Sequence, residues 1–160
     1  MPAFAELSQQ LEGPLGVDLV HIPSFGHDLN RPGTSFLKSA FTVGERMVAK
    51  RRRFDIEPPN VCDPAIRHFA GRWAAKEAVV KAWSQALYGT PPPIARDEMN
   101  WQEIEIVPDA WGRVAVKLHG RVAQAVAETL GTGDSTSANA FHVSISHDGD
   151  YAVAVVMVLQ

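Results

Sequence analysis

Two short segments of this chain place charged groups where they could hold a metal ion and a phosphate. Residues 72–82 read RWAAKEAVVKA, which sets Glu77 and Lys81 four positions apart, about one turn of a helix. Residues 16–20 read GVDLV, with the carboxylate of Asp18 in a short apolar run. Carboxylate oxygens are ligands that Mg²⁺ prefers, and a lysine beside them can neutralise phosphate charge. The pattern therefore indicates a site for a divalent metal and a pyrophosphate.

The pair of Glu77 and Lys81 has two interpretations. A glutamate four residues before a lysine is also a common ion pair that stabilises a helix by about 0.2–0.5 kcal/mol. The surroundings favour a binding role, because Trp73 shares the face of the pair and small residues flank it. These small residues, which let another element approach closely, are Ala74, Ala75, Ala78 and Ala82. A charged pair on such a face is expected to be half-buried, where it needs a ligand or a metal.

Asp18 also has two interpretations. Strand alternation places Val17 and Leu19 on the face opposite Asp18. The carboxylate is then either an acid at a strand edge that caps a turn or pairs with a lysine, or one of two metal ligands from separate elements. Mg²⁺ is usually held by one or two carboxylates, with water and phosphate completing its shell.

A third motif combines hydroxyl and imidazole groups near the C-terminus, where residues 143–148 read VSISHD. Alternation puts His147 on the same face as the apolar residues before it, so a core histidine is the alternative to a binding role. Ser146, His147 and Asp148 do not form a serine-hydrolase triad, because adjacent strand residues point to opposite faces and no G-x-S-x-G elbow is present. The histidines and acids of this region match no structural zinc spacing.

Two further features bear on binding. The densest positive run is 50–53, and it is interpreted as a solvated helix end, with docking of an acidic protein partner as the alternative. Nucleic-acid binding is disfavoured, since the chain has a net charge of -3 and no aromatic residue interrupts the run. Trp111, at the tip of an expected turn, is predicted to be exposed and to touch a ligand.

Periodicity predicts the elements that position these groups. Thr42, with Glu45 three residues on, and Asp63, followed by a proline, are the two strongest helix starts. The last strand is apolar on both faces and must be covered on both, by the long helix or by another subunit. Strands are expected at 15–22, 101–107, 114–118, 141–147 and 151–159, and helices at 42–53, 63–87 and 121–130. Residues 1–14 are expected to be a leader, 15–160 a single domain, and 131–139 a polar loop.

The composition excludes several classes of protein. A chain of 160 residues with 46% hydrophobic and 21% charged residues can bury the core of one globular domain. Its one cysteine, Cys62, cannot form an internal disulfide, which fits a reducing cytoplasm. We expect no membrane association, because no apolar stretch is long enough to span a bilayer and the N-terminus lacks the features of a signal peptide.

As an ordered set, segments 16–20, 72–82 and 143–147 resemble the holo-acyl-carrier-protein synthase family of 4′-phosphopantetheinyl transferases. Each motif alone is weak, whereas their order and spacing are specific, and the match runs from about Leu15 to the C-terminus. The similarity is strongest to actinobacterial members, whose WAAKEAV and D-x-WGR segments read much like those of this chain.

The resemblance implies an α+β fold, with a compact antiparallel sheet packed on a long helix. It implies homotrimers with an active site at each subunit interface. The implied reaction moves 4′-phosphopantetheine from coenzyme A to a serine of an apo acyl carrier protein in fatty acid biosynthesis, releasing 3′,5′-ADP. The same chemistry on a carrier domain of a type I fatty acid synthase or polyketide synthase is the first alternative. An interaction subunit that keeps the fold without catalysis is the second.

The resemblance also implies residue roles. Asp18 and Glu77 would hold Mg²⁺, and Lys81 would contact the phosphates. Arg72, Ser146 and His147 would bind coenzyme A, and the loop around Gly112 and Arg113 would lie near the adenine. The base that accepts the serine proton stays open between Glu77 and a water on the metal. The chain departs from the family at 21–25, which lacks the usual basic residue, and at Val114, which replaces a common proline.

Overall fold

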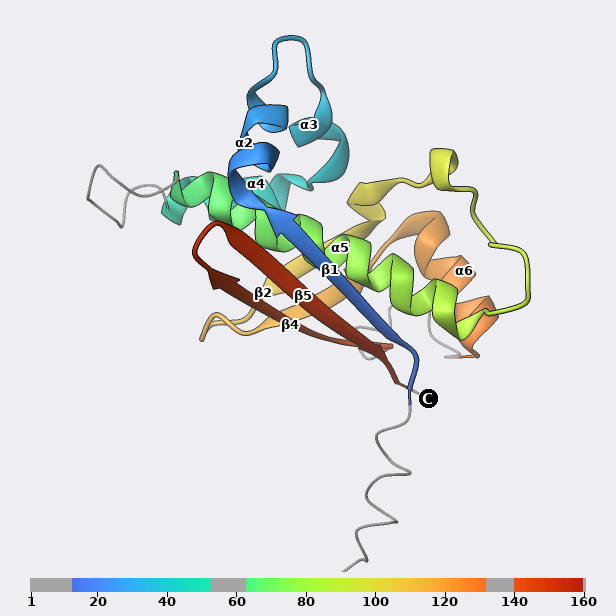
Figure 1. Cartoon of the computed structure of the whole chain (residues 1–160). Coiled ribbons are helices and arrows are strands. Elements are labelled where there is room, and N and C mark those ends of the chain that lie inside the picture. Colours follow the sequence, from blue (N-terminus) through green and yellow to red (C-terminus); the bar gives the residue numbers. More distant parts are fainter. Residues whose placement is uncertain (1–12, 53–62, 132–139, 160) are drawn as a thin grey trace, which may run out of the picture.

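The computed structural model describes residues 13–52, 63–131 and 140–159. The long helix α5 (Pro64–Ala86) lies across one face of an antiparallel sheet. This sheet has three strands in the order β1 (Leu15–His21), β5 (Tyr151–Val158) and β4 (Phe141–Asp148) (Figure 1). A second, two-stranded sheet pairs β2 (Ile104–Pro108) with β3 (Val114–Leu118). The predicted α+β class, with antiparallel strands packed on a long helix, is confirmed, and the strands divide between two sheets.

The remaining elements surround this centre. Helices α2 (Ile22–Asn30), α3 (Phe36–Ala40) and α4 (Val43–Arg52) group at the N-terminal end of α5, and α6 (Gly120–Leu130) lies near its C-terminal end (Figure 1). Two 3-10 turns, η1 (Arg96–Glu98) and η2 (Trp101–Glu103), occupy the segment between α5 and β2. No helix in the described ranges is long and apolar enough to cross a membrane.

Both predicted helix starts are confirmed. The side chain of Asp63 accepts a hydrogen bond from the Ala65 amide at 2.9 Å, and Pro64 opens α5. At α4, the Thr42 hydroxyl accepts from the Glu45 amide at 3.1 Å, while Glu45 accepts from the Thr42 amide at 2.9 Å. These reciprocal bonds form a capping box, so the local sequence determines where each helix begins.

Three expectations differ from the structure or lie outside it. Residues 101–103 form a 3-10 turn instead of the start of a strand, because the Asn100 side chain accepts from the Gln102 amide and caps the turn. Helices α2 and α3 were not predicted; Pro23 ends the strand as expected but also begins α2, where proline is tolerated. The expectations for 1–12, for Arg53 and for 132–139 lie outside the described residues.

Strand β1 packs on α5 at backbone distance. A Cβ atom on Gly16 would lie 2.0 Å from the Ala78 carbonyl oxygen and 2.5 Å from the Ala82 amide nitrogen, so only glycine fits there. Four alanines of the helix, Ala74, Ala75, Ala78 and Ala82, are fully buried. The expected close approach of another element to the alanine face therefore occurs, and that element is β1.

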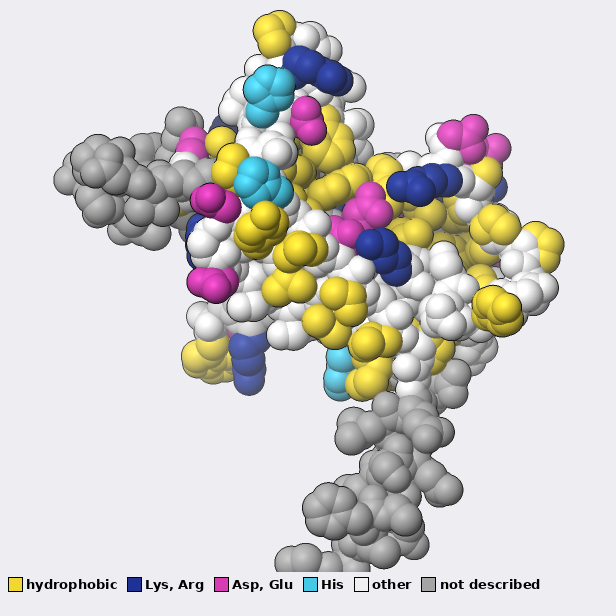
Figure 2. All heavy atoms as spheres, in the orientation of Figure 1, with side chains coloured by type: hydrophobic (Ala, Val, Ile, Leu, Met, Phe, Trp, Pro, Cys, Tyr) yellow, Lys and Arg dark blue, Asp and Glu magenta, His cyan; other side chains and the backbone are white. Residues whose placement is uncertain are grey.

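The opposite face of the three-stranded sheet has no cover among the described residues. Large apolar side chains of β1 and β5 lie open there, and Figure 2 shows apolar side chains gathered over these strands. They are Leu15, Val17, Leu19, Tyr151 and Val155. We call this set the apolar strip. The last strand is thus covered on one face by α5, as predicted, and its other face is half-exposed.

The buried ion pair of Lys76 and Glu45 connects helices α4 and α5 to the second sheet. The Lys76 ammonium group is fully buried and donates to Glu45 Oε2 at 2.9 Å, to the Ala40 carbonyl at 2.7 Å and to the Trp101 carbonyl at 2.9 Å. Glu45 in turn accepts from the Ile106 amide at 3.1 Å. Burial lowers the pKa of Lys76, and the Glu45 carboxylate opposes that shift. The pair therefore joins α4, α5 and β2 through one charged cluster.

Replacing Lys76 with methionine should lower the free energy of unfolding by about 3–5 kcal/mol, because it leaves the Glu45 carboxylate buried without its counter-charge. Urea denaturation of Lys76→Met against wild type measures the loss. Lys117→Met, at an exposed position of β3, is the control and should change stability by less than about 0.5 kcal/mol. A loss below about 1 kcal/mol for Lys76→Met would contradict a structural role for the buried pair.

Candidate functional site

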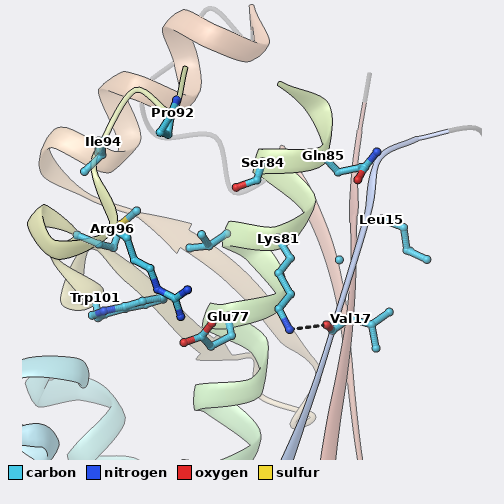
Figure 3. A pocket seen from close by; sticks show the side chains of 13 residues that line it. Leu15, Val17, Glu77, Lys81, Ser84, Gln85, Pro92, Ile94, Arg96 and Trp101 are labelled. Atoms are coloured by element: carbon cyan, nitrogen blue, oxygen red, sulfur yellow. Dashed lines mark hydrogen bonds between the residues drawn. The ribbon is translucent and has the colours of Figure 1, made fainter. Parts of the chain in front are cut away.

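Strand β1 and helix α5 bring Asp18, Glu77 and Lys81 to one place. The Lys81 ammonium group donates to Asp18 Oδ1 at 2.8 Å and to the Val17 carbonyl at 3.1 Å (Figure 3 shows the second bond). The Asp18 side chain is 15% exposed and that of Lys81 is 50% exposed. Lys81 therefore pairs across to the strand, which links the strand acid to the helix. Of the two interpretations of Asp18, pairing with a lysine is therefore seen in the structure.

Glu77 faces a cavity of about 550 Å³ that Lys81 also lines. We call it the carboxylate cavity. Burial and the nearby charge of Asp18 raise the pKa of Glu77, while Arg96 and Lys81 oppose the rise. Two carboxylates near one another and partly shielded from water favour a cation between them. The side walls are mainly apolar and include Val80, Pro92, Ile94, Met99 and Trp101.

The donor set of this cavity fits Mg²⁺ better than a softer metal. Within the described ranges, no group of three or more His, Cys, Asp or Glu side chains is placed to hold a metal ion. Two carboxylates from separate elements match the way Mg²⁺ is held, since that ion keeps water and substrate phosphate in its remaining positions. The burial of the Glu77 carboxylate close to the charge of Asp18, which raises the pKa of Glu77, supports such a cation.

The other predicted coenzyme A residues lie at a second cavity of about 410 Å³, which we call the basic cavity. Arg72, Gly112, Arg113 and His147 all line it, together with residues of β4. Gly71 makes room for the imidazole, because a Cβ atom there would lie 2.7 Å from His147 Nε2. That ring nitrogen lies 3.0 Å from the Arg67 carbonyl oxygen, which can only accept, so it carries the proton.

Ser146 is placed differently from the rest of its predicted set. It is exposed, and its neighbours along β4 alternate with it in burial, so it lies on the sheet face opposite His147. The residues of this strand that line the basic cavity are Val143, Ser144, Ile145 and His147. Ser146 therefore does not line the cavity that Arg72 and His147 share, although Ser144 of the same face does.

The hairpin beside the basic cavity presents an aromatic ring to solvent. Trp111 is 80% exposed, as expected for the tip of this turn. The Arg113 guanidinium lies 5.0 Å from the centre of the Trp111 ring and pairs with Asp109 at 2.6 Å. The ion pair holds Arg113 beside the ring, so a flat cationic and aromatic surface borders the cavity.

Sequence analysis missed two contributors to the carboxylate cavity. Arg96 lines it from η1, and Trp101 lines it from η2. The segment before them, with prolines at 91–93, was treated only as the end of the long helix. A lone arginine in a loop carries no periodic signal, so only the fold shows that it faces Glu77.

Comparison with known proteins shows the superfamily of this chain. A profile of the 4′-phosphopantetheinyl transferase superfamily matches residues 14–156. The chain belongs to this superfamily. A holo-[acyl-carrier-protein] synthase of Corynebacterium glutamicum is 47% identical over 140 residues, which are 88% of this chain and 93% of that protein. One from Mycobacterium marinum is 39% identical over 143 residues, 89% of this chain and 93% of its own length.

Solved structures of this superfamily agree in fold. The complex of a Chronobacterium ammoniagenes enzyme with coenzyme A superposes with a TM-score of 0.76 at 46% identity and covers 90% of this chain and 94% of its own. The acyl carrier protein synthase of Mycobacterium tuberculosis gives a TM-score of 0.62 at 37% identity, covering 91% and 95%. The resemblance drawn from the three motifs, including its actinobacterial character, is confirmed.

Replacing Glu77 with glutamine should raise the melting temperature at pH 7 in metal-free buffer. Because the folded state holds the pKa of Glu77 above its ordinary value of 4.5, the ionised carboxylate destabilises the fold at neutral pH. That penalty is absent once the group is protonated, so the gain should shrink as the pH falls toward 4.5. Thermal unfolding at both pH values measures it.

Added Mg²⁺ supplies the matching test. Mg²⁺ should raise the melting temperature of the wild type but not of Glu77→Gln, because the neutral amide of glutamine is a much weaker ligand than the Glu77 carboxylate. An equal response of the two proteins to Mg²⁺ would contradict a metal site at Glu77.

Proposed function

We propose that this chain is a holo-acyl-carrier-protein synthase, which transfers 4′-phosphopantetheine from coenzyme A to a serine of an apo acyl carrier protein. The observation that carries the proposal is that Glu77 and Lys81 line one cavity and Asp18 is bonded to that Lys81, in a chain 47% identical to a protein of that name. Its place of action would be the cytoplasm, where coenzyme A and carrier proteins meet.

The proposed step is a phosphoryl transfer. The serine oxygen of the carrier protein bonds to the phosphorus that bears pantetheine. The bond from that phosphorus to the bridging oxygen breaks, and its electron pair leaves with 3′,5′-ADP. The serine proton passes to a base at the site, for which Glu77, with its raised pKa, is available.

The chain's own residues position and neutralise these groups. Asp18 and Glu77 would hold Mg²⁺, which when bound supplies positive charge to the diphosphate. Lys81 would move from Asp18 to the phosphates, since a lysine ammonium on a flexible stem can exchange one oxygen partner for another. Arg72, Arg113 and His147 would bind the charged nucleotide part, with Gly112 leaving room beside the adenine. Ser146 would complete this set from the other sheet face.

The homotrimer proposed for this protein would join the two cavities. They share no lining residue in the part of the chain that the structure describes, so a single copy offers Glu77 and the basic residues in separate places. Leu15 and Val17 belong both to the apolar strip and to the wall of the carboxylate cavity. A second copy that covers the strip would therefore also enclose the cavity. A head-to-tail contact repeated three times closes a ring with equivalent sites.

Mass spectrometry of an apo carrier protein incubated with coenzyme A, Mg²⁺ and this protein tests the reaction. We expect a mass gain of one phosphopantetheine group. Asp18→Asn should slow the transfer at least about 100-fold, because it removes a charge from the metal-binding pair. Glu128→Gln, an exposed acid on α6 that lines neither cavity, is the control and should keep the wild-type rate. No mass gain with any carrier protein would contradict the proposed function.

Light scattering tests the assembly. The wild type should have a mass near three times 17.4 kDa. The double variant Val17→Lys, Leu19→Lys should be a folded monomer with little transfer activity, because it places charges in the apolar strip. Val43→Lys changes an equally apolar residue, 67% exposed on α4, and should stay trimeric. A wild-type monomer that is fully active would argue against a site shared between subunits.

A further inference from the structure

We propose that Arg96 binds the phosphoryl group that is transferred and is a catalytic residue of the reaction, an inference that rests on the proposed function. Arg96 lies outside the three motifs, yet it lines the carboxylate cavity with Glu77 and Lys81. Figure 3 shows its guanidinium directed toward the Glu77 carboxylate, from the wall opposite α5.

The loop that presents Arg96 is held at several points. Three successive prolines, 91–93, restrict its backbone before the residue. Ile94 is only 5% exposed and anchors the loop in the core. After Arg96, the Glu98 amide donates to the Ala95 carbonyl at 3.0 Å. The guanidinium is therefore presented from a constrained loop, as a charge-stabilising group requires.

The donors of Arg96 are available, whereas two of the three N–H donors of Lys81 are in use. Lys81 donates to Asp18 and to the Val17 carbonyl. Arg96 makes no hydrogen bond within the described part of the chain. A guanidinium has five N–H donors in a planar fork that matches two phosphate oxygens at once. Arg96 can thus bind two phosphate oxygens at once without first leaving a protein partner, whereas Lys81 has one N–H left for phosphate.

The charges of the cavity balance only when Arg96 is counted. Glu77 in the wall and Asp18, which is paired with Lys81, contribute two negative charges, and Lys81 and Arg96 contribute two positive ones. A divalent cation would leave an excess of two positive charges, which matches a diphosphate with one negative charge on each phosphorus. Without Arg96, the occupied site would carry an uncompensated negative charge in a cavity with mainly apolar walls.

From its position, Arg96 would contact the phosphate that is transferred and not the phosphate that leaves with the nucleotide. The carboxylate cavity adjoins a second cavity of about 280 Å³, which Arg96 does not line, and the two share Val80, Ser84, Pro92, Ile94 and Met99. We call the two cavities together the channel. This channel follows α5 from Glu77 to Leu87, a rise of about 15 Å. An extended pantetheine chain is uncharged and of similar length, about 14 Å at the reach of an extended backbone. The phosphorus that bears this chain would therefore lie at the channel mouth, beside Arg96.

The experiment measures turnover and product binding in Arg96→Gln. Turnover at saturating coenzyme A should fall about 100-fold, as for the loss of one donor to a developing charge. The dissociation constant of 3′,5′-ADP, measured by calorimetry with Mg²⁺, should change less than about twofold, because the proposal puts the nucleotide away from Arg96. Arg96→Lys should recover only part of the rate, since an ammonium cannot form the two parallel bonds of a guanidinium.

Arg121→Gln is the matched control, because it changes an arginine that pairs with Glu98 of the same loop but does not line the cavity. It should keep turnover within about twofold of wild type, since an exposed ion pair contributes little. Wild-type turnover in Arg96→Gln, an equal loss in Arg121→Gln, or weaker 3′,5′-ADP binding that matches the loss of rate would each overturn the assignment. A wild-type protein without transfer activity would instead refute the function on which the inference rests.

Discussion

The contact of Gly16 with the backbone of α5 is the constraint on which the carboxylate cavity depends. Any side chain at this position would collide with the Ala78 carbonyl or the Ala82 amide. The strand therefore lies as close to the helix as two backbones allow. Asp18, two residues further along β1, is then within hydrogen-bonding distance of Lys81. A wider separation would leave the strand acid and the helix acid too far apart to act on one ion.

The two lysines of α5 show how one helix serves structure and chemistry at once. Lys76 is fully buried, and its three acceptors come from three different segments. Lys81 is half-exposed at the cavity and has acceptors from β1 alone among the described residues. Lys76 keeps its partners, because separating a buried ion pair costs much free energy. Lys81 can exchange partners, because water reaches its ammonium group. Rotation along the helix, about 100° per residue, separates the two environments.

The exposed apolar strip and the separation of the carboxylate cavity from the basic cavity are related features of this fold. Both the apolar strip and the carboxylate cavity are bordered by Leu15 and Val17. The basic cavity lies elsewhere, beside β4 and the hairpin that carries Arg113. In the trimer that we propose, burial of the strip would supply the free energy of association, and the same contact would bring the two cavities together. Assembly and activity would then depend on the same surface.

The sequence by itself determined the elements and the family. Helix starts at Thr42 and Asp63 follow from capping side chains only a few residues away, and alternation predicted the strands around Asp18 and His147 correctly. Three short motifs in order were sufficient to indicate the superfamily. These signals are local, so neither packing nor partners were needed to detect them.

Only the tertiary structure decided what those elements bring together. The pairing of Lys81 with Asp18, instead of a simple helical pair, depends on where β1 crosses α5. The 3-10 turn at Trp101 arises where a strand was expected, and the Trp101 carbonyl there accepts from Lys76, 25 residues away. Arg96 faces Glu77 because a loop folds back along the helix, which no periodicity encodes. Such contacts join residues far apart in the chain, and their geometry is set by the packing of the whole core.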